Sequence, residues 1–151
     1  MIEREAALIR TATLPDGRYR DLVMAVLQQL PDRWDAYREC SFHLSEQKPE
    51  EGYACSNLGE TVPDNLPRAG HEHQTWVVTL FTPWLDRLSD EAVSWAIAHE
   101  LGHVCSGIRC GQFSAKAAHA GGELVADMIA RAWGFWYEEE TFEVEAPLLH
   151  P

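Results

Sequence analysis

The sequence predicts a single domain of the α+β class, and three observations support this prediction. A chain of 151 residues can bury a core of its own. Apolar residues recur at helical spacing from Arg18 to Leu30, and two further helical segments lie between Ser89 and Gly107 and from Glu123 to about Trp133. Between the first helix and the other two come three strand-like runs: 40–44, 53–58 and 74–81. We therefore expect a helix, a small three-stranded sheet and two more helices.

Local signals set the bounds of the helices. The first begins after the turn residues Leu14–Gly17 and ends at Pro31, since proline lacks the N–H that a helix needs. Ser89 is a natural N-cap for the second helix, and the acidic Asp90 and Glu91 in its first turn complement the helix dipole. These bounds place the polar residues described below inside helices.

The connections between the predicted elements differ in character. The runs 40–44 and 53–58 are expected to form a hairpin, and residues 59–73 a long connection. In the segment 107–122, Gly111, Gly121 and Gly122 predict irregular backbone. The connection 59–73 carries His71-Glu72-His73. If this segment were a strand, its two histidines would share a face and could bind a metal. A solvated loop is the favoured interpretation of these residues.

The segment His99-Glu100-Leu101-Gly102-His103 is an H-E-x-x-H motif. Two histidines four apart on a helix lie on one face, so their ring nitrogens can converge on one Zn²⁺. Glu100 lies beside them and can act as a general base on a metal-bound water. Apolar residues on the opposite side would face the core: Val93, Ile97, Leu101 and Val104.

A second motif, E-x-x-A-D, begins twenty residues after His103, at Glu123. Glu123 and Asp127 share a helical face, and the rest of this helix is apolar, so we expect it to be buried. A buried pair of carboxylates is costly unless it is neutralised, and a zinc ion with its histidine ligands would do that. Glu123 would complete a His₂Glu site that leaves one position for water. Asp127 would accept the free N–H of a ligand histidine.

With these two motifs the chain resembles the gluzincin metallopeptidases, and in its size the minigluzincins. The resemblance rests on 99–103, on 123–127 and on the spacing between them; before about Gln74 only the order of elements matches. It implies a minimal zincin-like fold in a single domain, 1–151, that binds Zn²⁺. The zinc ligands that it implies are His99, His103 and Glu123.

The function that the resemblance implies is that of a zinc metalloendopeptidase, a hydrolase of peptide bonds. Glu100 is then the base on a zinc-bound water, and Asp127 orients a ligand. The strand 74–81 would run along the cleft and pair through its edge with an extended substrate. His119 and Tyr137 are candidates for transition-state stabilisation. Fuller gluzincins carry a C-terminal subdomain with an electrophilic histidine, and we do not expect the two dozen residues after Asp127 to supply it.

Two alternatives to a general peptidase stay open. One is a zinc-stabilised regulatory or interaction module with little or no hydrolytic activity; Glu100 argues against it, because a structural site has no use for a base. The other is a phage- or toxin-associated protease with one dedicated target. The tail 138–151 is acidic and then apolar. By resemblance it could inhibit the enzyme by blocking the cleft, but a frayed terminus is the favoured interpretation.

The charge and the termini suggest a partner class and a compartment. A formal net charge of −12 argues against nucleic acid and anionic membranes as partners, since both need a basic patch. A peptide or protein substrate remains. The sequence shows neither a signal-peptide pattern nor a membrane-spanning run, so we expect a cytoplasmic protein. Its four cysteines are then expected to be reduced thiols: Cys40, Cys55, Cys105 and Cys110.

Overall fold

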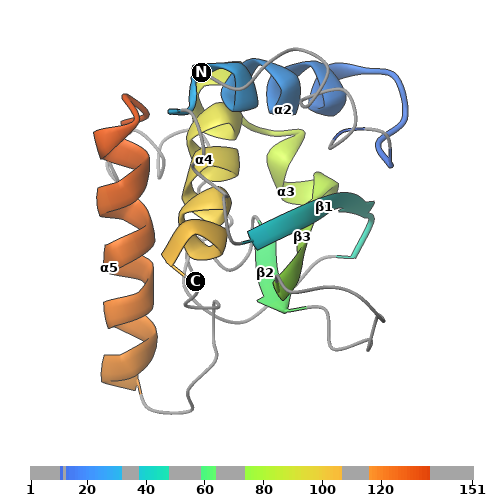
Figure 1. Ribbon diagram of the computed structural model, residues 1–151. Coiled ribbons are helices and arrows are strands. Elements are labelled where there is room, and N and C mark those ends of the chain that lie inside the picture. Colours follow the sequence, from blue (N-terminus) through green and yellow to red (C-terminus); the bar gives the residue numbers. More distant parts are fainter. Residues whose placement is uncertain are drawn as a thin grey trace.

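The computed structural model describes residue 11 and residues 13–31, 38–47, 59–63, 74–106 and 116–136. The described elements are α2 (Arg18–Gln29), β1 (Arg38–Ser45), β2 (Gly59–Pro63), β3 (Gln74–Phe81), α3 (Thr82–Leu85), α4 (Asp90–Ser106) and α5 (Lys116–Ala132). They form an α+β arrangement in which α4 passes between α5 and a three-stranded sheet, with α2 across one end (Figure 1). Among the described helices, none is both long and apolar enough to cross a membrane.

The sheet has β3 at its centre. β1 pairs with it in parallel, from Arg38 opposite Gln74 onwards, and β2 pairs with its other side in antiparallel register, with Gly59 opposite Leu80. The predicted role of 74–81 as a substrate-pairing edge is therefore wrong, because strands cover both edges of β3. Its predicted bounds as a strand are confirmed.

The structure also corrects the expected connection at 59–73. Residues 59–63 form the edge strand β2. The sequence did not predict this strand, because the segment is short and has glycine and proline at its ends. Its strand conformation depends on pairing with β3. The described partner of β1 is likewise β3, and the run 53–58 that was expected to pair with β1 lies outside the described residues.

The core lies between one face of the sheet and α4. Alternate residues of β1 and β3 point to this face and are buried: Cys40, Phe42, Trp76, Val78 and Leu80. From α2 come Val23, Val26, Leu27 and Leu30, as its helical stripe predicted. Burying a side chain of this size stabilises the fold by roughly 1.5–3 kcal/mol. As a result, α4 is enclosed on all sides from Ala92 to Val104, except for the half-buried Ser94.

The two long helices have defined ends. At the start of α4 the backbone N–H of Ala92 donates to Ser89 Oγ at 3.3 Å, which confirms the predicted N-cap. At the end of α5, Gly134 has φ +95° and its N–H donates to the carbonyl of Arg131, while Phe135 N–H donates to Ala130. This pair of bonds is a Schellman motif, so Gly134 ends the helix.

The structure corrects two expectations about α5. The helix begins at Lys116, so 116–122 is helical and not irregular; alanines there offset the low helix propensity of the glycines. The helix is also only partly buried. Ala126 and Ala130 are fully buried, whereas Leu124 and Met128 are each 60% exposed. α5 therefore packs through small residues and leaves large apolar side chains on its outer face.

Candidate metal centre

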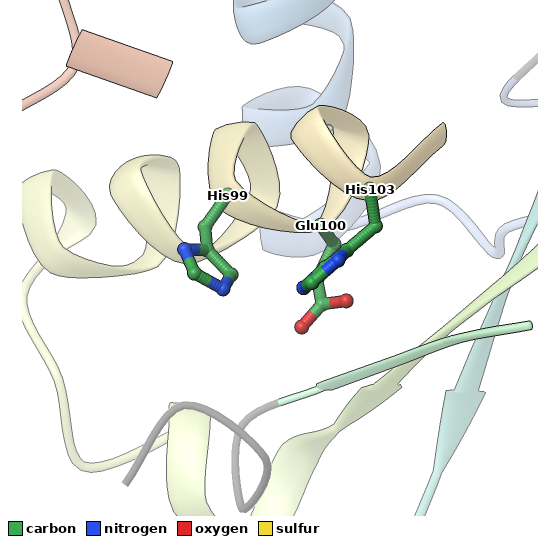
Figure 2. A group of neighbouring side chains, drawn as sticks. All are labelled: His99, Glu100 and His103. Carbon is green, nitrogen blue, oxygen red and sulfur yellow. The ribbon is translucent and has the colours of Figure 1, made fainter. Parts of the chain in front are cut away.

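Three polar side chains of α4 lie together in the interior. His99 and Glu100 are each 2% exposed and His103 is fully buried. Their possible ligand atoms all lie within 4.8 Å of one another. Figure 2 shows the three side chains extending from the same side of the helix. The structure thus brings together the three groups that the H-E-x-x-H spacing predicted on one face.

Aromatic packing holds the two imidazole rings. The ring centroids of His99 and His103 are 5.0 Å apart and the rings meet edge to face at 80°. One turn earlier, the buried indole of Trp95 lies 5.3 Å from the ring of His99 at an interplanar angle of 39°. Trp95, His99 and His103 recur every four residues along one stripe of α4. The neighbouring indole restricts the orientations open to the His99 ring.

The strand β2 supplies the wall beside Glu100. The hydroxyl of the buried Thr61 donates to Glu100 Oε2 and also lies 3.3 Å from the Glu100 carbonyl oxygen. Gly59 lies so close that an added Cβ would be 3.0 Å from Glu100 Cγ and 3.1 Å from Oε1. Sequence reasoning missed both residues, because only the register of β2 against β3 places them on this face.

The E-x-x-A-D helix meets the motif helix at Gly102. A Cβ on Gly102 would lie 2.6 Å from the carbonyl oxygen of Ala126, so the two backbones are in direct contact. Ala126 belongs to the second motif, three residues after Glu123 and one before Asp127. The half-buried carboxylate of Asp127 pairs with Arg131 one turn further along α5, at 3.1 Å.

The roles predicted for the other site residues remain predictions. Glu123 and His119 lie within α5, but their side chains are not among those described. Several predicted features fall outside the described residues: Tyr137, the tail 138–151, His71–His73, Gly107, Cys55 and Cys110. The roles of Glu123 as a ligand and of Asp127 as the partner of a ligand histidine are therefore untested.

The chemistry of the described group fits a metal ion. Two imidazoles and a carboxylate offer nitrogen and oxygen donors, and a compact set of this kind suits zinc and several other divalent transition metals. The group could hold such an ion, and its geometry does not select one metal. Comparisons with models of protein families, with curated proteins and with solved structures found no match to this chain. The candidate site therefore depends on the residues of this chain alone.

Proposed function

We propose that this protein is a zinc-dependent metalloendopeptidase with a minimal zincin-like fold. The observation that carries the proposal is the buried group of His99, Glu100 and His103, whose ligand atoms lie within 4.8 Å of one another. Apolar side chains at these positions would stabilise the fold more, because burying ionisable groups costs free energy. The group is therefore expected to serve a function. The E-x-x-A-D sequence on the adjacent helix supports the same reading.

We assign three ligands to the metal: His99, His103 and Glu123. The assignment of Glu123 is supported by the contact between Gly102 and Ala126, which brings α5 against the motif helix about one turn after Glu123. Two histidines and one carboxylate leave a fourth position for water or substrate, as in catalytic zinc sites. Asp127 is assigned to orient a ligand histidine, with Arg131 restraining its carboxylate.

The chemical step that we assign to this chain belongs to Glu100. When a zinc ion is bound, it acts as a Lewis acid and makes water a stronger nucleophile near neutral pH. The Glu100 carboxylate accepts a proton from the attacking water while the new C–O bond forms at the scissile carbonyl. It then delivers this proton to the nitrogen of the leaving amine as the C–N bond breaks. Thr61 holds the carboxylate during both transfers.

The substrate is assigned to the outer edge of β2. β2 is an edge strand of the described sheet, and its residues Gly59 and Thr61 contact Glu100. An extended peptide that adds to such an edge gains main-chain hydrogen bonds. Its backbone would then run beside the base. This assignment replaces the expectation that the substrate pairs with β3.

Cleavage of a mixed peptide library by the zinc-loaded protein, read by mass spectrometry, tests the proposal. We expect cuts by the wild type that are lost in Glu100→Gln, while zinc stays bound at one per chain. The control is Glu91→Gln, which changes an exposed acid of the same helix and should leave the cuts unchanged. A wild type that binds zinc but makes no cuts would contradict the peptidase and favour the zinc-held interaction module.

A further inference from the structure

The core face of the sheet changes character at β2. On β1 and β3 this face carries large apolar residues, among them Phe42, Val78 and Leu80. The register places Gly59 opposite Leu80 and Thr61 opposite Val78. Two of the β2 positions on the core face therefore hold a residue without a side chain and a small hydroxyl residue. The side chain of Glu100 lies against both of them.

Gly59 and Thr61 together hold the carboxylate of Glu100 from two sides. Thr61 hydrogen-bonds to one carboxylate oxygen, Oε2. Gly59 lies against the other oxygen, Oε1, where an added Cβ would come within 3.1 Å. The two residues are two apart on one strand, so they present the same face to Glu100. The position of the carboxylate is thus fixed from β2 and not only from its own helix.

This restraint matters because Glu100 has two competing uses. Its carboxylate lies within 4.8 Å of the ligand atoms of His99 and His103, close enough to become a metal ligand itself. A carboxylate that ligates the metal cannot also take a proton from water as a general base. We propose that Thr61 is a positioning residue that holds Glu100 as the base and keeps it from ligating the metal. This inference rests on the proposed function of the site.

The test compares Thr61→Val, which keeps the shape but removes the hydroxyl, with Thr61→Ser, which keeps the hydroxyl. For Thr61→Val we expect kcat to fall by about 10–100-fold, the range found when partners of metal-site residues are removed, with little change in KM. Thr61→Ser should recover most of the loss. Zinc affinity should stay equal or rise in Thr61→Val, because Glu100 is released to join the ligands. Thr79→Val, on the opposite face of β3, should change none of these values.

The absorption spectrum of the cobalt-substituted protein provides a readout that needs no activity, since cobalt bands report the ligand set. The spectrum of Thr61→Val should differ from that of the wild type, and adding Glu100→Gln should abolish the difference. If Thr61→Val does not fold, Gly59→Ala displaces the same carboxylate from its other side and should shift the spectrum in the same way.

Two results would overturn the role of Thr61. One is an unchanged cobalt spectrum in a folded Thr61→Val protein, and the other is an equal loss of kcat in the Val and Ser variants. A wild type without peptidase activity would instead overturn the proposed function. The spectral comparison would still decide whether Thr61 controls the ligation of the metal by Glu100.

Discussion

Gly102 of α4 and Ala126 of α5 touch backbone to backbone, and each belongs to one of the two motifs. A Cβ on Gly102 would lie 2.6 Å from the Ala126 carbonyl oxygen and 2.9 Å from its Cα. Because backbone atoms cannot rotate away as a side chain can, a larger residue at Gly102 would have to push the helices apart. Gly102 therefore sets the distance between the H-E-x-x-H and E-x-x-A-D helices.

Replacing this glycine should destabilise the protein. Alanine favours a helix over glycine by about 1 kcal/mol, but overpacking against rigid backbone typically costs 1–3 kcal/mol. We expect Gly102→Ala to lower the free energy of unfolding in urea and to weaken zinc binding, because α5 must shift. Ser94→Ala, at a half-buried position of the same helix, is the control and should change stability little. A urea-unfolding midpoint for Gly102→Ala equal to that of the wild type would contradict the close packing of the two helices.

Metal binding should depend on the buried histidines and not on exposed ones. We expect His103→Ala to lose zinc on dialysis, since it removes one of the two nitrogen ligands that we propose. His43→Ala removes an exposed histidine of β1 and should keep one zinc per chain. Elemental analysis of the dialysed proteins, with circular dichroism to verify folding, measures both. Equal zinc content in the two variants would argue against the site.

The third ligand can be identified by removing its charge. If Glu123 ligates the metal, Glu123→Gln should weaken zinc binding by at least the 10–100-fold seen for outer partners of metal ligands. Glu91→Gln, at an exposed position at the start of α4, serves as the control. Competition with a chelating dye gives both affinities. If Glu123→Gln binds zinc as tightly as the control, the third ligand must be sought elsewhere, with Glu100 as the first candidate.

Alkaline stability should depend on Tyr19. Its hydroxyl donates to Asp86, and burial, followed by this hydrogen bond, raises the pKa of Tyr19 above its ordinary value. The folded protein therefore holds the phenol proton more tightly than the unfolded chain. The stabilisation is complete below the unfolded pKa of about 10 and is lost as the pH rises from there towards the folded pKa. As the pH rises above about 10, towards the folded pKa, the free energy of unfolding should fall more steeply for the wild type than for Tyr19→Phe; parallel curves would exclude this linkage.

The elements that the sequence predicted well have local signals. The helical stripe of α2, the β-branched run of β3 and the N-cap of α4 each lie within a few residues of the structure that they determine. The same holds for His99, Glu100 and His103, whose common face follows from helical spacing alone. These features needed no knowledge of the rest of the fold.

The features that the sequence did not predict depend on distant packing. Gly59–Pro63 is a strand because β3 pairs with it, and Thr61 reaches Glu100 only through that register. The exposure of Leu124 and Met128 depends on which side of α5 meets α4. An apolar sequence does not reveal this, because the contact is made by a glycine and an alanine instead of the larger residues.

The parallel pairing of β1 and β3 has a consequence for how this protein can vary. Parallel neighbours require the chain to return across the sheet between Ser45 and Gln74, and β2 lies inside that return. A change of chain length on either side of β2 would leave the register of β1 with β3 intact, since these two strands pair directly with each other. β2 can thus vary at the positions that do not contact Glu100, beside the fixed pair of β1 and β3. For the peptidase that we propose, replacing β2 at all positions except Gly59 and Thr61 is the most direct route to an altered substrate preference.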